Sequence, residues 1–202
     1  MQRMPHSRIW KKLLVEAFEK PAATAIIRTA QIEFQQLLAA GSPIPVRTAN
    51  LRNNLRTRIY PGLAIYRALF DLTPDTTSRL EIVEKLFRSV FFRGMNRGIR
   101  LINYLPDPFP LIRPVLRLMT RQPYLPGSQF LVEDSQDCFA IDTRHCFILD
   151  ALTALNAREL TVLYCKTDDW LSEALPKVHW LRTKTLAEGD EKCDFRWCRQ
   201  NL

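Results

Sequence analysis

The sequence predicts an α+β fold, with an N-terminal helical part followed by a small antiparallel sheet with two inserted helices. Apolar residues recur at helical spacing from residue 8 to about residue 103, and after Gly127 short stretches alternate in the manner of strands. The 202 residues are 47% apolar and 25% charged, which is ordinary for a globular protein and excludes extensive disorder and collagen-like sequence. We expect one compact domain overall.

Three regions make up the basic part of the chain. Residues 1–48 form an N-terminal helical extension, in which Pro21 interrupts the first helix. Residues 49–103 form a basic helical region. Residues 104–127 contain six prolines, so we expect a connector with at most one short helix.

Residues 128–202 form the α+β region, and they carry all five cysteines. FLVEDS and CFAIDTR read as two strands, and CFILDALTAL and ARELTVLYCKTDDWLSEAL read as the inserted helices. VHWLRTKTLA is predicted to be a strand, EGDEK its hairpin turn and CDFRWCRQ the return strand.

Charge is distributed unevenly along the chain. Residues 1–130 contain 20 Lys and Arg against 8 Asp and Glu, a net charge of +12, whereas the remaining residues have a net charge of −4. A solvated helix face explains the basic run, because half of an amphipathic helix has this composition. The alternative is an anionic partner or membrane surface, bound through the arginines of this run: Arg88, Arg93, Arg97, Arg100, Arg113 and Arg117.

The start of the chain lacks the apolar core and cleavage site of a secretory signal, and no stretch of about eighteen apolar residues occurs. We therefore expect a cytoplasmic protein, with a peripheral membrane location as the alternative. In a reducing compartment the cysteines would be thiols, ligands or redox groups.

Three cysteines are candidates for chemistry. Cys146 is predicted to lie at a helix start, where the helix dipole together with Arg144 and His145 would lower the thiol pKa. Cys165 lies in the next helix and Cys193 in the terminal strand. The simpler interpretation is that these cysteines are small buried hydrophobic residues. Their spacing matches no standard zinc motif, although the three could converge with His145 or His179.

Carboxylates and an arginine accompany these cysteines. Asp168 shares a helix face with Cys165, whereas Asp194 follows Cys193 on a strand and points to the opposite face. Asp168 or Asp194 could serve as a general base, and Asp169 is expected to be a solvated helix charge. Arg182 is expected mid-strand, where it would snorkel at an edge or bind a substrate carboxylate. Thr183 and Thr185 are expected to point outward beside it.

This tail resembles the L-2-amino-thiazoline-4-carboxylic acid hydrolase family. The matching elements are a cysteine that opens a helix, a C-x-x-D about twenty residues later, and an R-x-x-T-L-A-x-G turn before C-D-F. Here they are Cys146, the pair Cys165 and Asp168, the turn that begins at Arg182, and 193–195. The upstream YPGLAIYRALFDL extends the resemblance from about residue 50 to the end, whereas residues 1–48 carry no matching motif.

The resemblance implies hydrolytic opening of a 2-amino-thiazoline ring to N-carbamoyl-L-cysteine. We expect neither a cofactor nor a metal. A cysteine thiolate would attack the amidine carbon, or a carboxylate would activate water. Arg182 and Arg144 are the candidates for binding the substrate carboxylate. Two other functions remain open: a non-enzymatic protein that docks through its basic helices on an anionic surface, and a ligand or metal sensor that uses the cysteines.

Overall fold

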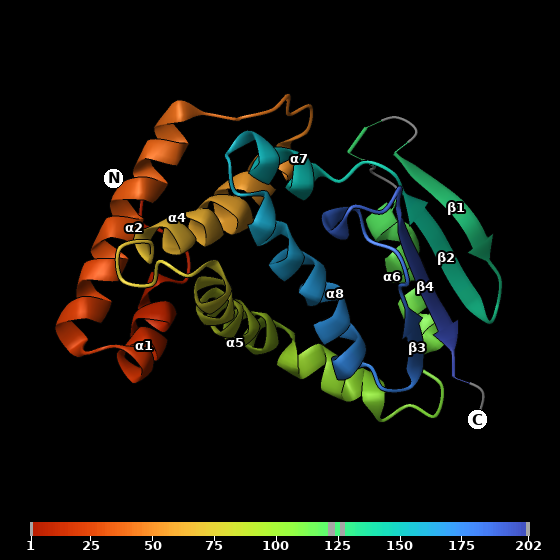
Figure 1. Ribbon diagram of the computed structural model, residues 1–202. Coiled ribbons are helices and arrows are strands. Elements are labelled where there is room, and N and C mark those ends of the chain that lie inside the picture. The colour runs from red at the N-terminus through yellow and green to blue at the C-terminus, as the bar shows by residue number, and fades with distance from the viewer. Residues whose placement is uncertain (1, 121–123, 126–127, 201–202) are drawn as a thin grey trace. The chain divides into compact units, whose positions relative to one another are not determined.

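The computed structural model of the chain confirms the α+β fold (Figure 1). It describes residues 2–120, 124–125 and 128–200, with 93–100 and 119 described as backbone only. The chain divides into two compact units. Unit 1 comprises residues 1–93 and 151–163, and unit 2 comprises residues 94–150 and 164–202.

Unit 1 is helical. Its elements are α1 (Ser7–Ala17), α2 (Lys20–Ala40), α3 (Ala49–Asn54), a π-helical turn (Leu55–Ile59), α4 (Tyr60–Ala68) and most of α5 (Thr76–Asn103). The first helix ends before Pro21, which falls at the start of α2, where its missing N–H costs nothing. The core of unit 1 is made by residues less than 1% exposed, among them Phe34, Ile59, Leu63 and Leu69.

Unit 2 contains the sheet. Its strands are β1 (Gln129–Asp134), β2 (Cys138–Thr143), β3 (Val178–Leu181) and β4 (Cys193–Arg199), antiparallel in the order β1-β2-β4-β3. Its helices are α6 (Phe109–Thr120) and parts of α7 (Phe147–Ala154) and α8 (Thr161–Ala174), the two helices inserted between β2 and β3.

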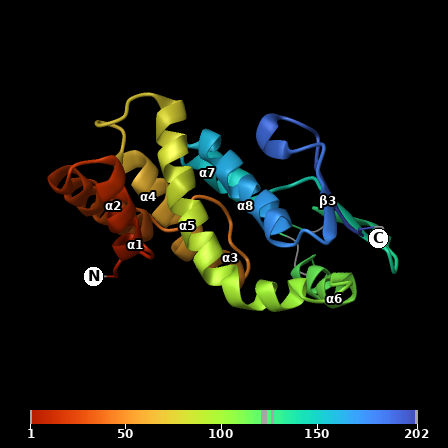
Figure 2. The same cartoon turned by 90° about the horizontal axis from the view of Figure 1, so that it is seen from below.

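One face of the sheet is covered by α6 (Figures 1 and 2). Register places Phe139 opposite Trp197 and Ile141 opposite Phe195, so these four side chains share that face. Phe109, Ile112 and Leu116 of α6 pack into the same cluster. The proline-rich connector therefore contains a twelve-residue helix, with Pro114 inside it.

Helix α6 provides a matched pair of leucines for a stability test. Leu116 is 4% exposed in the core, whereas Leu118 is 66% exposed. Leu116→Ala is expected to lower the free energy of unfolding by about 2–5 kcal/mol, through lost burial and the cavity left behind. Leu118→Ala should change it by less than about 0.5 kcal/mol. Thermal and urea unfolding of both variants measure the difference, and equal losses would contradict this placement of α6.

The last two strands differ from the prediction. β3 ends at Leu181, so Arg182, Thr183 and Thr185 lie in an eleven-residue loop, 182–192, that contains a short 3-10 turn at Leu186–Glu188. The predicted strand VHWLRTKTLA is therefore too long and its predicted turn EGDEK too short, whereas the return strand and its antiparallel pairing with the first are confirmed. The reason lies more than ten residues away from the end of β3: the Asp194 carboxylate accepts hydrogen bonds from the backbone N–H groups of Thr183 and Lys184, which are therefore not available to a strand ladder.

Two cysteines are paired rather than free. Cys138 and Cys198 lie directly opposite each other on β2 and β4 and form a disulfide. By register they lie on the sheet face opposite the one that α6 covers. The remaining three cysteines, Cys146, Cys165 and Cys193, are free thiols.

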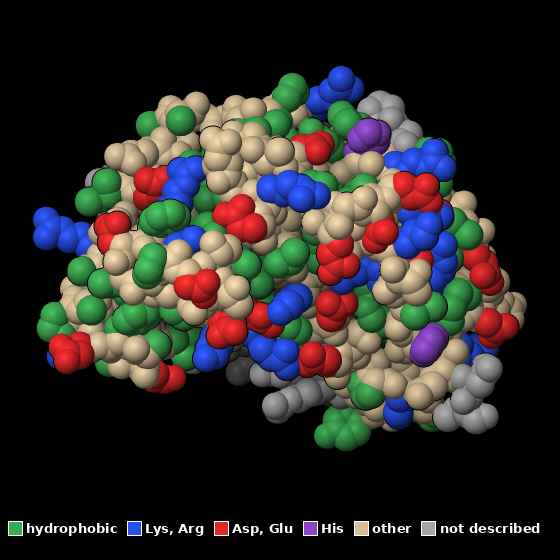
Figure 3. Space-filling model, viewed as in Figure 1, with side chains coloured by type: hydrophobic (Ala, Val, Ile, Leu, Met, Phe, Trp, Pro, Cys, Tyr) green, Lys and Arg blue, Asp and Glu red, His purple; other side chains and the backbone are tan. Residues whose placement is uncertain are grey.

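The basic run is partly neutralised. Arg113 and Arg117 both form ion pairs with Asp134 of β1, and Arg88 lies 5.1 Å from the ring centre of Phe92. The side chains of Arg93, Arg97 and Arg100 lie outside the described residues. On the face shown in Figure 3, acidic and basic side chains lie side by side over the sheet-bearing part. Among the described helices, none combines the length and the apolar composition needed to cross a bilayer.

Candidate functional site

Two of the three free cysteines contact one buried threonine in unit 2, and the third lies near both of them. The Sγ atoms of Cys165 and Cys193 each lie 3.7 Å from the Thr185 Oγ1. Cys146 is close enough to interact electrostatically with both other thiols. Thr185 is only 6% exposed, so the expectation that it points outward is wrong.

Different elements bring these sulfur atoms together. Cys146 precedes the first residue of α7, and its carbonyl accepts the N–H of Asp150 at 3.0 Å, as a helix-capping residue does. Cys165 lies on α8, and Cys193 is the first residue of β4, opposite Thr143. The Cys193 Sγ also accepts the backbone N–H of Leu186 at 3.3 Å. The sequence indicated each position separately, but their convergence depends on the 182–192 loop.

Asp194 fixes that loop. Its carboxylate accepts the N–H of Thr183 at 2.8 Å, the N–H of Lys184 at 2.6 Å and the hydroxyl of Thr183 at 2.6 Å. Partial burial opposes ionisation of Asp194, but these hydrogen bonds outweigh burial and hold its pKa below the usual range. An ionised carboxylate with its oxygens committed to the loop is suited to positioning the loop rather than to moving protons.

The role of Asp194 predicts a pH dependence. A carboxylate with a depressed folded pKa stabilises the fold above its unfolded pKa, and this stability is lost as pH falls through the folded pKa. Asp194→Asn should therefore be less stable than the parent at pH 7, with the gap closing below about pH 4. Urea unfolding of both proteins from pH 7 to pH 3 measures this gap. Asp190→Asn, which changes another acidic residue of the same loop, is measured alongside for comparison. A gap that stays constant with pH would contradict the assignment.

Arg182 is surrounded by acceptors. Its guanidinium donates to the Cys165 carbonyl at 3.2 Å, to Asp168 at 3.3 Å and to Asp169 at 3.1 Å, and its side chain is 11% exposed. Asp169 also accepts the indole N–H of Trp180 at 3.3 Å, so the expectation of a purely solvated Asp169 is wrong. Arg182 thus ties the loop to α8.

Burial dominates the pKa values of Cys165 and Cys146. It raises the pKa of Cys165 to about 12, against the opposing effects of the Thr185 hydroxyl and the Arg182 charge. It also raises the pKa of Cys146, although the N–H groups of Ile148 and Leu149 hydrogen-bond to that sulfur and oppose the rise. The expectation of a lowered Cys146 pKa is therefore wrong, because desolvation exceeds the effect of the helix N-terminus.

The remaining candidates lie at the surface. Arg144 and His145 are exposed, and the Arg144 guanidinium carbon lies 4.8 Å from the ring centre of Phe130. His179 is exposed on β3. Within the described parts of the chain, no group of three or more His, Cys, Asp or Glu side chains is arranged to hold a metal ion.

The region that carries this cluster matches a known family. A comparison with protein families aligns residues 62–197, about two thirds of the chain, with the family described as L-2-amino-thiazoline-4-carboxylic acid hydrolase. The chain belongs to this family. All the cysteines of the cluster, Thr185, Arg182 and Asp194 lie inside the matched range. The resemblance found in the tail is thereby confirmed for the family, and its hydrolase designation agrees with a site built from thiols and carboxylates.

Other comparisons add little about this member of the hydrolase family. No curated protein matches it. The crystal structure of the Fe(II) unliganded H-NOX protein from K. algicida is 12% identical, with a TM-score of 0.40 and 97% of each chain covered. A single-residue mutant of that protein is also 12% identical, with a TM-score of 0.41, and 98% of this chain and 97% of that chain are covered.

Some members of the cluster were missed from sequence. Thr185 and Asp169 appeared to be ordinary polar positions, yet one links two thiols and the other binds Arg182 and Trp180. The available signal was the pattern R-x-x-T, in which a threonine stands at a fixed distance from the arginine.

Proposed function

We propose that the protein hydrolyses a cyclic amidine of the 2-amino-thiazoline-4-carboxylate type, with Cys146 as the nucleophile. The observation that carries this proposal is the contact of two thiols, Cys165 and Cys193, with Thr185 and the proximity of the third, Cys146, to both of them. The cluster lies beside the loop held by Asp194 and inside the family-matched region. Thiols gathered at one place on separate elements suit covalent chemistry on a soft, electrophilic carbon.

Cys146 is the best placed of the three thiols. Cys193 is only 5% exposed and so poorly accessible, whereas Cys146 and Cys165 are both partly exposed and burial raises the pKa of both. Cys146 is partly exposed, and the N–H groups of Ile148 and Leu149 point at its sulfur. Those two donors favour the thiolate once substrate or base removes its proton.

The proposed reaction has two steps. The Cys146 thiolate adds to the carbon between the ring sulfur and the two nitrogens, and the ring carbon–sulfur bond breaks to release the substrate thiol. This leaves an isothiourea on the enzyme. Water then adds to the same carbon, the bond to Cys146 breaks, and the product is an N-carbamoyl thiol. One water molecule is consumed and no oxidant or reductant is needed.

The substrate carboxylate needs a cation. Arg182 already binds Asp168 and Asp169, so Arg144 fits better, because it is exposed and two residues from Cys146. The cationic amidine would be attracted to Asp168, whose side chain is 37% exposed.

The direct test supplies purified protein with 2-amino-thiazoline-4-carboxylate and follows thiol release, with mass spectrometry of the N-carbamoyl product. Turnover above the rate without protein is the expected result. Folded protein that releases no thiol from this substrate or from ring analogues lacking the carboxylate would overturn the proposal. The non-enzymatic docking function would then take its place.

A further inference from the structure

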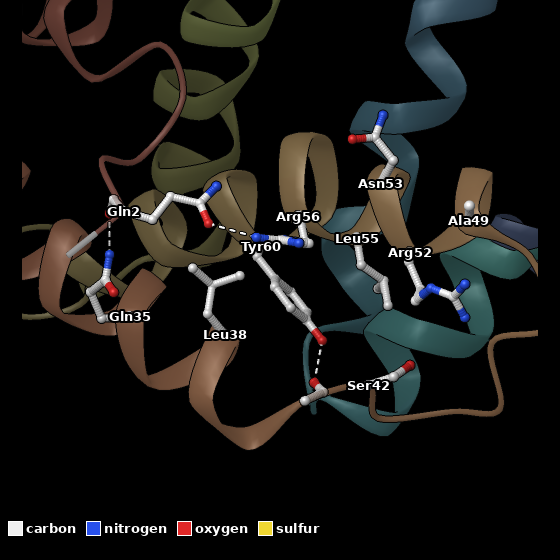
Figure 4. A pocket seen from close by; sticks show the side chains of 11 residues that line it. Gln2, Gln35, Leu38, Ser42, Ala49, Arg52, Asn53, Leu55, Arg56 and Tyr60 are labelled. Carbon is white, nitrogen blue, oxygen red and sulfur yellow. Dashed lines mark hydrogen bonds between the residues drawn. The ribbon is translucent and has the colours of Figure 1, made fainter.

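A second site lies in unit 1, apart from the cysteine cluster. A groove of about 760 Å³ opens between the C-terminal part of α2, the loop after it and the segment from α3 to Tyr60 (Figure 4). The volume falls in the range of small-molecule sites. Its lining residues lie between positions 2 and 60, ahead of the range that matches the hydrolase family.

The groove is strongly biased toward positive charge. Residues 34–70 contain five arginines and no Asp or Glu. Two of these arginines, Arg52 and Arg56, line the groove, and none of the described lining residues is acidic. Arg67, by contrast, has its own carboxylate partner in Glu33. The groove thus holds two cations without a counter-charge among its described lining residues, which attracts anions.

The two arginines are held apart by apolar side chains. In Figure 4, Arg56 lies on the side of Gln2, above the Tyr60 ring, and Arg52 lies on the opposite side, with Leu55 between the two arginines. The Arg56 Nη2 donates to the Gln2 Oε1 at 2.8 Å, which orients the guanidinium and leaves further N–H groups for a ligand. Tyr60 and Leu55 are 3% and 2% exposed.

The floor of the groove is well fixed. The Tyr60 hydroxyl donates to the Gly41 carbonyl, and the π-helical turn Leu55–Ile59 sets the direction of the chain between Arg52 and Tyr60. Such turns occur frequently at functional sites. The floor is held by hydrogen bonds and buried side chains, and Gln2 orients Arg56 on it before a ligand arrives.

We propose that this groove binds an organic dianion with an oxyanion at each end, one for Arg52 and one for Arg56, and an apolar chain between them. Two cations on opposite sides of the groove match a ligand with two separated negative charges better than a ligand with one negative charge. The apolar floor at Leu55 and Tyr60 matches the chain that joins them. Carboxylates and phosphates share this recognition chemistry.

Calorimetric titration with α,ω-dicarboxylates from glutarate to sebacate tests the proposal. Octanoate, with one charge, and 1,8-octanediol, with none, are the controls, and hexane-1,6-diyl bisphosphate compares phosphate with carboxylate ends. At least one dianion should bind at least about tenfold more tightly than octanoate, since a hydrogen-bonded charge contributes this much. Equal affinity of octanoate and every dianion, or no binding at millimolar concentration, would overturn the proposal.

Variants locate the binding. Arg52→Gln and Arg56→Gln should each weaken the dianion about tenfold, to the level of octanoate. Arg28→Gln removes the same charge from an exposed position of α2 outside the groove and should have no effect. Ala49→Asp adds a carboxylate in the groove, at a helix start where it favours folding, and should also weaken binding. A loss in Arg28→Gln equal to that in Arg52→Gln would contradict a built site.

Discussion

Cys146→Ala is expected to lower kcat/KM for thiol release by at least about a hundredfold, because the attacking atom is removed. Cys165→Ala and Cys193→Ala should keep activity within about tenfold of the parent, since they change only the packing around the nucleophile. Thiol release under identical conditions compares the three variants, and mass spectrometry of quenched reactions should detect an isothiourea adduct only where Cys146 is present.

The double variant Cys138→Ala/Cys198→Ala is the matched control, because it removes two sulfur atoms on the other face of the sheet. Its activity should remain close to that of the parent. Activity that survives in Cys146→Ala but disappears in Cys193→Ala would indicate that Cys193, on β4, is the nucleophile. Activity that survives in all three single variants would favour direct attack by water.

The second large effect is a steep dependence of the reaction on pH. Burial raises the pKa of Cys146, so its thiolate is scarce at pH 7 and its fraction grows tenfold with each pH unit below that pKa. We expect kcat/KM to rise about tenfold per unit from pH 6 to pH 8 and to keep rising beyond the ordinary thiol pKa of about 8.5.

Alkylation of Cys146 by iodoacetamide, followed by peptide mass spectrometry, gives the thiolate fraction without substrate. Its rate should rise in parallel with turnover. A carboxylate that activates water would behave differently, because an aspartate of ordinary pKa is ionised above about pH 5, where turnover would then be level. A level turnover profile beside a rising alkylation rate would therefore contradict thiol attack.

Local patterns predicted most of the fold. Helical spacing located the helices on both sides of Pro21, and alternation located β1 and β2 close to their observed limits. The 182–192 loop could not be predicted in this way, because it is shaped by hydrogen bonds between Asp194 and the backbone of Thr183 and Lys184. VHWLRTKTLA alternates like a strand, and the side chain that ends the strand stands more than ten residues later in the sequence.

Prediction of the cysteine cluster was limited in the same way, because contacts between distant segments cannot be inferred from local patterns. The positions of Cys146, Cys165 and Cys193 were evident, and the helix start at Cys146 was correctly expected. The raised pKa of Cys146 was not expected. The helix dipole can be inferred from one segment of sequence, whereas burial of the thiol depends on which other segments cover it. The partners of Arg182 were missed for a similar reason: its carboxylates come from α8, which the sequence does not place beside β3.

The division of the chain has a consequence for dissecting it. Residues 151–163 belong to unit 1, although the residues on both sides belong to unit 2. Within unit 1 this insert supplies Glu159, which accepts the Tyr66 hydroxyl at 2.7 Å, and the carbonyl of Leu155, which accepts Arg67 at 2.6 Å. A fragment that stops at residue 93 would lose the acceptor of the buried Tyr66 hydroxyl and one of the two acceptors of Arg67, which would keep only Glu33. The two units are therefore best studied in the whole chain, because each consists of two separate segments and neither a single cut nor a circular permutation makes either unit continuous.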